Sequence, residues 1–370
     1  MLITTQEDLH KLCESIKPTD LIGLDTEGDS LHSYKDKVCL IQLAKGDEYY
    51  IIDPLANIDL DAFIRRLECC DLVLHGADYD LRMLFQYYNF RPKKELFDTM
   101  FAGELLGLES INLAGLVEQF YKITIDKDER KSNWAKRPLS EKQLNYALLD
   151  VKYLFGLKEK LTELLNQSDK KQWHKECCEK LVNNTQEIKE PKSYKWRVKG
   201  SGLLTRQQLN FLSTLWSWRD KQAEKEDQPG FRILANQQMI YLSEICAKKS
   251  DLISVNKFLL PKHVKEKYHA EIYLNLKEAA LVKASDWPEQ KKIERVEVTV
   301  DKALIAKIKS DVRIEAERFN VKPFLILSNA VLVDILQQNI KSSIAQNSQL
   351  MDWQKKIVKP ILNKYNIKVV

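Results

Sequence analysis

Four carboxylates and one tyrosine fall in three separate blocks of the first 150 residues, and they constrain the fold more than any other feature. Asp25 and Glu27 form the first block, Asp80 the second, and Tyr146 with Asp150 the third. Four unpaired carboxylates within a few ångströms would repel one another strongly, so they converge only around positive charge. We therefore expect a fold that brings these distant blocks together around bound cations.

The ligand type narrows the choice of cation. Carboxylate oxygens are hard ligands that suit Mg²⁺ or Mn²⁺, and none of the six histidines or seven cysteines shows the spacing of a zinc site. Two divalent ions roughly 4 Å apart cleave phosphodiester bonds by in-line attack. The acidic set thus predicts two Mg²⁺ or Mn²⁺ ions.

Composition limits the class of protein. A chain of 370 residues has room for two or three domains, and 44% hydrophobic with 30% charged residues is ordinary for globular proteins. Apolar runs such as residues 38–43 are too short to span a membrane, and no signal peptide is recognisable. The odd cysteine count and the absence of a CxxC motif favour a reducing compartment. We expect a cytoplasmic protein with no membrane partner.

Charge is distributed unevenly along the chain. Residues 1–190 hold 26 basic and 34 acidic residues, a net charge of −8, whereas residues 191–370 hold 32 and 19, a net charge of +13. The acidic half carries the carboxylate blocks. The basic half has the composition of a region that holds a polyanion, although lysine-rich helices are also common as merely solvated surfaces.

The pattern of apolar residues predicts an α/β catalytic domain followed by helices. Four segments are rich in β-formers, and they span residues 21–27, 38–44, 48–53 and 71–75. Gly76 precedes a helix over about residues 78–90, and Asp98 is a plausible N-cap of the next helix. Helical periodicity continues to about residue 183. Strands first, with helices between and after, indicate a mixed sheet flanked by helices.

Two polar stretches divide the rest of the chain. We predict a catalytic domain, a linker, a helical bundle, a second linker and a second helical bundle, with boundaries at 1–185, 186–200, 201–284, 285–298 and 299–370.

Local geometry explains how the acidic residues share a site. Side chains alternate along a strand, so Asp25 and Glu27 project from the same face. Tyr146 and Asp150, four residues apart on a helix, are also neighbours on one face. Asp80 falls on the first or second turn of its helix.

Three stretches of sequence surround these residues and resemble one family. The stretches are LIGLDTEGDS (21–30), VLHGADYDLRML with FDTM (73–84 and 97–100) and KSNWAKRPLSEKQLNYALLDVKYL (131–154). They resemble the DEDDy subclass of 3′→5′ exonucleases, and most closely ribonuclease D. The exosome-associated and Werner-type exonucleases share these motifs, so residues 1 to about 160 leave the choice of substrate open.

The resemblance implies a ribonuclease H-like fold and release of nucleoside 5′-monophosphates by two-metal hydrolysis. In that scheme Asp25 binds both ions. Glu27 and Asp150 hold the ion that activates water, and Asp80 supports the ion at the leaving 3′-oxygen. Tyr146 positions the nucleophile.

Four further residues are candidates for nucleic-acid contacts. Thr26 lies between two of the expected ligands. His75 suits either a nucleotide contact or a satisfied position at a strand end. Trp134 suits either stacking on a base or the protein core, and Arg137 lies in a loop before Pro138, where it favours contact with the phosphate backbone.

Three other polar residues receive structural assignments. We expect Asp78 to be a surface or first-turn residue and Asp98 to be a helix cap. Asn133 stands where the family usually has an acid, so a local contact there differs.

The helical half resembles a second known module. Residues 203–283 resemble an HRDC domain through Leu209, Trp216, Trp218, Arg219 and Leu242. A more degenerate version of the pattern occurs in residues 300–370. One exonuclease domain followed by two such bundles is the order found in ribonuclease D.

These observations give one main hypothesis and two alternatives. The main hypothesis is a monomeric 3′→5′ exoribonuclease acting on structured RNA ends such as tRNA precursors. The alternatives are a 3′→5′ exonuclease acting on single-stranded DNA, and a nucleic-acid-binding scaffold without activity.

Overall fold

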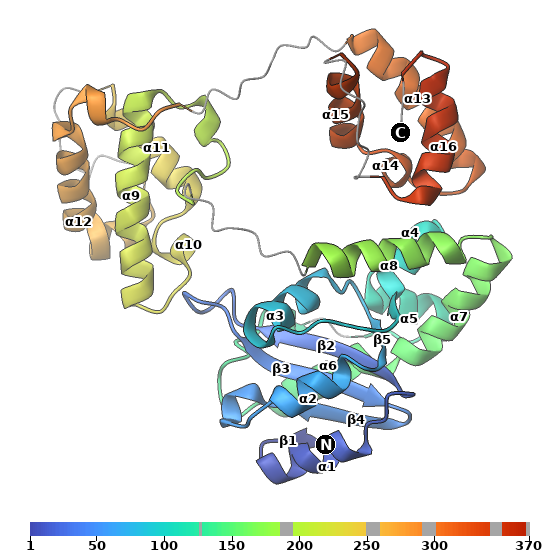
Figure 1. The fold of residues 1–370 in the computed structure, drawn as a ribbon. Helices are drawn as coiled ribbons and strands as arrows, with labels where there is room; N and C mark the ends of the chain where they lie inside the picture. The colour runs from blue at the N-terminus through green and yellow to red at the C-terminus, as the bar shows by residue number, and fades with distance from the viewer. Residues whose placement is uncertain (126–127, 186–194, 249–259, 291–300, 341–349, 368–370) are drawn as a thin grey trace. The chain divides into compact units, whose positions relative to one another are not determined.

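The structure is a computed structural model that describes residues 1–125, 128–185, 195–248, 260–290, 301–340 and 350–367. The chain forms two compact units, each built from separate stretches of sequence (Figure 1). The first unit comprises residues 1–28, 37–187 and 298–370. The second comprises residues 29–36 and 188–297.

A six-stranded mixed sheet forms the centre of the first unit. Its strand order is β1-β4-β3-β2-β5-β6. The pairs β2–β3 and β3–β4 are antiparallel and the other three are parallel. The strands are β1 (Leu2–Ile3), β2 (Leu21–Gly28), β3 (Val38–Lys45), β4 (Glu48–Ile52), β5 (Asp71–Leu74) and β6 (Leu96–Asp98). The mixed sheet predicted from the sequence is confirmed, and β1 and β6 are additions at its edges.

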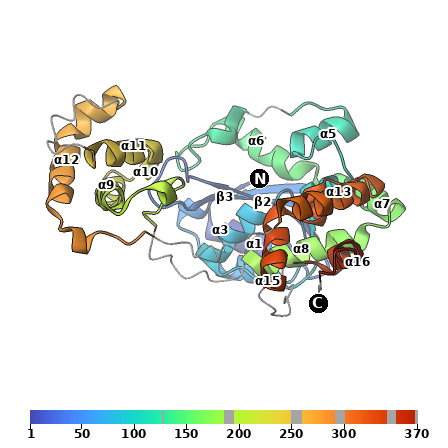
Figure 2. The same cartoon turned by 90° about the horizontal axis from the view of Figure 1, so that it is seen from above.

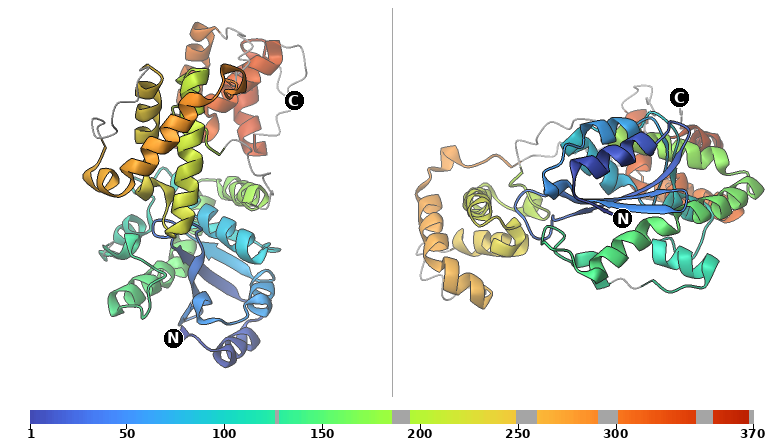
Figure 3. Two further views of the ribbon diagram at one scale, coloured as in Figure 1. Left: turned by 90° about the vertical axis from the view of Figure 1, so that its left-hand side faces the viewer. Right: turned by 90° about the horizontal axis from the view of Figure 1, so that it is seen from below.

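Helices cover both faces of this sheet (Figure 3). Apolar residues of β2 such as Ile22 and Leu24 pack against the helices α1 (Gln6–Ser15), α2 (Asp61–Leu67) and α3 (Asp78–Tyr88). The alternate residues of β2 point to the face covered by α6 (Glu141–Lys152) and α7 (Leu154–Gln167). The remaining helices before residue 186 are α4 (Thr99–Leu105), α5 (Leu113–Tyr121) and α8 (Lys171–Thr185).

The C-terminal helices belong to the same unit and share its core. They are α13 (Lys302–Arg318), α14 (Pro323–Ile326), α15 (Asn329–Ile340) and α16 (Asp352–Asn363). The ring of Trp353 stacks on that of Trp173 in α8, with centroids 4.4 Å apart, and Phe319 meets Trp173 edge-on. The backbone N–H of Trp353 also donates to Glu176 (3.1 Å). Figure 2 shows these red helices over α7 and α8.

The second unit is a small helical bundle. Its helices are α9 (Arg206–Lys225), α10 (Gly230–Ile233), α11 (Asn236–Cys246) and α12 (Lys262–Leu281). Arg219 is buried and donates to the carbonyl oxygen of Leu234 and to Asn236 Oδ1, which ties α9 to the turn before α11. The segment 29–36 joins this bundle, because the backbone N–H of Tyr34 donates to Asp227 Oδ1 (3.1 Å).

The two predicted bundles are helical, as expected. Most of the predicted linkers, residues 186–194 and 291–298, lie outside the described residues. The five-part division of the chain stays a prediction. The structure adds that residues 298–370 group with the catalytic part and not with the first bundle.

Short 3-10 helices occur at Pro54–Ala56, Asp128–Lys131, Ser201–Leu203 and Ala284–Asp286. Within the described ranges, no helix has the length and apolar character needed to cross a bilayer.

Candidate active site

A pocket of about 520 Å³ opens where β2 and β5 end. Its walls include all five residues predicted to be catalytic, together with Thr26 and His75. The acidic blocks that are far apart in the sequence therefore meet in one cavity, as predicted from the sequence.

Strand β2 delivers the first two carboxylates. Asp25 pairs with Gln42 of β3, and Glu27 pairs with Leu40, so both acids project from one face of the strand. The register shifts after Glu27, where the pairing with β3 becomes irregular. The acids thus lie at the point where the sheet stops and the pocket begins.

Helix α6 delivers the third block, and its start is fixed by a capping box. The hydroxyl of Ser140 accepts a hydrogen bond from the backbone N–H of Gln143, and the side chain of Gln143 accepts one from the N–H of Ser140. From this start, Tyr146 and Asp150 lie one turn apart on the face that lines the pocket.

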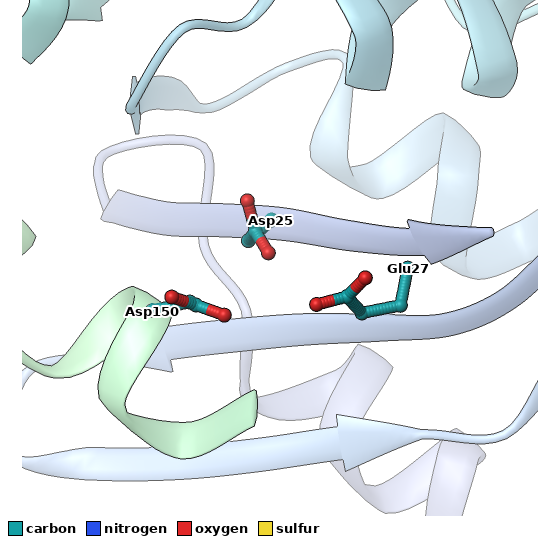
Figure 4. Close-up of side chains that lie close together, drawn as sticks. All are labelled: Asp25, Glu27 and Asp150. Carbon is teal, nitrogen blue, oxygen red and sulfur yellow. The ribbon is translucent and has the colours of Figure 1, made fainter. Parts of the chain in front are cut away.

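Three of the carboxylates form a compact cluster. The ligand oxygens of Asp25, Glu27 and Asp150 all lie within 4.8 Å of one another. Figure 4 shows these side chains pointing toward a common centre, two from the sheet and one from α6. All three are partly exposed to the pocket. Such an arrangement has the donor type and spacing that a divalent cation needs.

Asp80 lies in the same pocket but is held differently. It is 5% exposed, and its Oδ1 accepts hydrogen bonds from the backbone N–H of Thr26 (3.0 Å) and from the Thr26 hydroxyl (2.6 Å). Thr26 therefore connects the two acidic blocks. Its role in this structure is to orient Asp80, which the sequence did not indicate.

The electrostatics of the pocket favour a bound cation. Burial and then the charges of Asp80, Asp150 and Glu27 raise the pKa of Asp25 well above its usual value. Burial and the neighbouring carboxylates raise the pKa of Glu27 to about 9 and that of Asp150 to about 7. Burial also raises the pKa of Asp80 to about 6, against the hydrogen bonds from Thr26. Cations would relieve both the desolvation and the repulsion.

Tyr146 is positioned by an aromatic neighbour. Its ring lies 5.9 Å from that of Trp134, centroid to centroid. Burial and the charges of Asp150, Glu27 and Asp25 raise the pKa of the Tyr146 hydroxyl, and Arg130 opposes this effect. The hydroxyl therefore remains protonated at neutral pH and is able to donate a hydrogen bond into the pocket.

Trp134 and Arg137 do not line the pocket. Trp134 is 1% exposed and packs with Leu40 and Ala147, so it has no free face on which a base can stack. The guanidinium of Arg137 forms a two-pronged ion pair with Asp53 (2.6 and 2.7 Å) and donates to the carbonyl oxygen of Trp134. The core alternative for Trp134 is thus the correct one. Arg137 is paired within the protein, and its contact with a phosphate stays a prediction.

The structure also places His75, Asp98 and Asp78, for each of which a structural role was considered. The His75 ring lines the pocket and lies 2.9 Å from the hydroxyl of Thr99, and burial lowers its pKa. Asp98 is a helix cap, as predicted. Its carboxylate accepts from the backbone N–H groups of Met100 and Phe101, and also from those of Gly76 and Ala77. Asp78 is an exposed first-turn residue that pairs with Arg82.

Several residues that line the pocket were not predicted from the sequence. The apolar residues that line the pocket are Met100, Ile111, Leu113, Ala114 and Ile125. Tyr79, Asn112 and Arg130 add polar groups. Arg130 lies in a four-residue 3-10 helix, where no periodic pattern reveals which way a side chain points.

Comparison with known proteins agrees with this geometry. A family model described as a 3′-5′ exonuclease matches residues 1–166. Ribonuclease D of Desulfotalea psychrophila is 29% identical over 364 residues, which are 97% of this chain and 96% of that relative. Ribonuclease D of Pseudomonas paraeruginosa is 30% identical over 340 residues, which are 90% and 89% of the two chains. The crystal structure of Escherichia coli RNase D has the same fold, with a TM-score of 0.73 at 23% identity over 99% of each chain.

The mixed sheet, the acidic pocket and the matched domain together define a 3′→5′ exonuclease. The relationship extends over nearly the whole chain and includes the helical half. The chain belongs to the ribonuclease D family.

Proposed function

We propose that this protein removes nucleotides one at a time from the 3′ ends of RNA and releases nucleoside 5′-monophosphates. The observation that carries the proposal is the cluster of Asp25, Glu27 and Asp150, which lies in one pocket with Asp80 and Tyr146. The names of the relatives supply the substrate class, since they are ribonucleases.

Each residue of the pocket has a proposed role. As the family resemblance implies, Asp25 would bind two divalent ions. Glu27 and Asp150 would complete one site, and Asp80 would complete the other. When bound, the ions supply the charge that makes water a nucleophile and stabilises the leaving 3′-oxygen. Tyr146 orients the attacking water through its hydroxyl. Thr26 holds Asp80 in place, and His75 faces the nucleotide across the pocket.

Mg²⁺ or Mn²⁺ fits this donor set best. All the candidate ligands are carboxylates, which are hard oxygen donors, and the residues lining the pocket include no cysteine. Zinc would favour nitrogen or sulfur ligands in a tetrahedral set.

The natural substrate is proposed to be structured RNA, such as the 3′ ends of tRNA precursors. The related Escherichia coli enzyme is described as an exoribonuclease involved in structured RNA processing. The basic helical half would hold the body of such an RNA through its phosphates. We further propose that the HRDC-like bundles serve this role, that the protein acts as a monomer, and that it works in the cytoplasm, where such RNAs are found.

One experiment tests the central proposal. Matched single-stranded RNA and DNA, labelled at the 5′ end, are incubated with the protein in Mg²⁺, Mn²⁺ or EDTA. We expect a ladder that shortens from the 3′ end, requires a divalent metal and forms faster on RNA. Faster degradation of DNA would instead assign the protein to DNA ends.

The matched control is Asp25→Asn, which removes charge with little change in shape. We expect this variant to lose nearly all activity while it still binds RNA. Equal activity in the variant would show that the acidic cluster is not the catalytic centre.

A further inference from the structure

Gln42 is the one residue of β3 with an unexplained polar side chain. It is fully buried, at 0% exposure, and neither its Nε2 nor its Oε1 has a hydrogen-bond partner within the described residues. Leaving a buried polar group unpaired costs about 1–3 kcal/mol, so native proteins rarely retain one without a reason. The surrounding residues of β3, from Val38 to Ala44, are otherwise apolar and buried.

The position of Gln42 connects it to the acidic cluster. Its Cα pairs with that of Asp25 on β2 and with that of Ile51 on β4. Residues directly opposite in an antiparallel pair project from the same face, with Cβ atoms about 4.5–5.5 Å apart. Gln42 therefore lies beside Asp25 on the face covered by α6, where its other neighbour Ile51 packs with Ala147.

Gln42 does not reach the position of the substrate. The residue is absent from the pocket lining, and its side chain has no solvent-exposed surface. Any role in the reaction must therefore pass through a residue that does reach the pocket. Asp25 is the direct cross-strand neighbour that does so.

We propose that Gln42 is a positioning residue for the metal centre, and that its amide N–H donates to the carboxylate of Asp25 once that carboxylate binds cations. The inference rests on the proposed two-metal function. A carboxylate shared between two ions must hold a fixed orientation, and a hydrogen bond from a buried amide supplies that constraint. Partners of this kind typically contribute 10–100-fold to metal affinity. This hydrogen bond would give the buried amide of Gln42 the partner that it lacks among the described residues.

The test compares Gln42→Met with wild type. Methionine has a similar length and volume but no amide. We expect the metal-free variant to fold with equal or higher stability, because it removes an unpaired polar group. We expect its affinity for Mn²⁺, measured by calorimetry without RNA, to fall by about tenfold or more. Its kcat on RNA should fall while KM stays unchanged, since Gln42 does not touch the substrate.

Leu40→Met is the matched control. Leu40 lies on the same strand and the same face, two residues from Gln42, and this swap nearly conserves volume. It should leave Mn²⁺ affinity unchanged. The proposal is overturned if Gln42→Met binds Mn²⁺ as tightly as wild type, or if it fails to fold, since the amide would then serve stability. Failure of the wild-type protein to bind Mn²⁺ or degrade RNA would contradict the proposed function itself.

Discussion

At the scale of single residues, the acidic cluster lowers the stability of the folded protein when no cation is bound to it. Burial raises the pKa of Asp25, Glu27 and Asp150, and the charges of neighbouring carboxylates raise it further. Asp80, buried beside them, adds to the repulsion. Without metal, the carboxylates of the cluster either bind protons or repel one another. Bound cations would remove both effects.

This cost predicts how stability depends on pH. The carboxyl of Glu27 has a usual pKa of 4.5 and a pKa of about 9 in the folded protein. Its contribution to stability is fully present below about pH 4.5 and is lost as the pH rises toward 9, because the unfolded chain gives up the proton first. In EDTA, the free energy of unfolding in urea should fall between pH 5 and pH 9. Saturating Mn²⁺ should restore it at pH 8, since the ion binds the folded state. Stability that rises over this range in EDTA would contradict the assignment.

Tyr146 allows a test of the chemistry apart from binding. Tyr146→Phe removes the hydroxyl but keeps the ring that packs on Trp134. We expect kcat to fall by about 10²-fold or more, as for loss of one positioned catalytic group, with Mn²⁺ affinity nearly unchanged. Single-turnover kinetics and a metal titration measure the two effects. Unchanged turnover would remove Tyr146 from the mechanism.

The candidate site was predictable from the sequence to the extent that it depends on local periodicity. The period of two on a strand and the i, i+4 spacing on a helix placed Asp25, Glu27, Tyr146 and Asp150 on shared faces. Contacts between distant segments were not predictable. Arg137 resembled a free cation because its partner Asp53 is 84 residues away.

At the scale of elements, Asp98 joins a helix to a loop of the site. Its carboxylate binds the N-terminus of α4 and the backbone of Gly76 and Ala77, next to His75. Gly76 has a positive φ of 68°, a conformation that suits glycine. Asp98 thus holds a turn that few other residues could stabilise.

We predict that Asp98→Ala destabilises the protein by about 2–3 kcal/mol, because it removes a cap and leaves buried N–H groups unpaired. Urea unfolding measures the loss. Asp78→Ala is the control, since its ion pair with Arg82 is exposed and should contribute less than about 1 kcal/mol. Equal losses in the two variants would contradict the role of Asp98.

Elements long enough to show a pattern were predicted well. The helix predicted over about residues 78–90 is α3, Asp78–Tyr88, and the segments 38–44 and 48–53 form β3 and β4. The strands β1 and β6 have two and three residues, too few to show alternation. They form because the edges of the sheet accept them as partners, which only the tertiary structure reveals.

At the scale of the whole molecule, the basic half predicts a strong dependence of RNA binding on salt. Lys221 and Lys225 are exposed on α9. If both contact phosphates, replacing them with alanine should reduce the slope of log K against log salt by about 1.4, or roughly 0.7 per contact on a single strand. Binding titrations from low to high salt measure this slope. Replacing Lys11 and Lys17, exposed lysines of the acidic half, is the control, and an equal change there would contradict the proposal.

The division of the chain into five parts stays a prediction, and the grouping of residues 298–370 with the catalytic part was not predictable from the sequence. Composition marks a boundary wherever polar residues accumulate, and that rule separated residues 299–370 from the catalytic part. The stacking of Trp353 on Trp173 joins elements about 180 residues apart, and no periodicity connects two such aromatic residues in advance.

This shared core has a consequence for biosynthesis. Residues from Ala44 to Ile367 contribute to a single apolar cluster. A ribosome that has made only the N-terminal half has therefore produced a sheet and an acidic pocket without the helices that cover α8. Until the C-terminal helices emerge, the nascent chain lacks the partners of the Trp173 surface on α8, and such exposed apolar surface favours aggregation during translation.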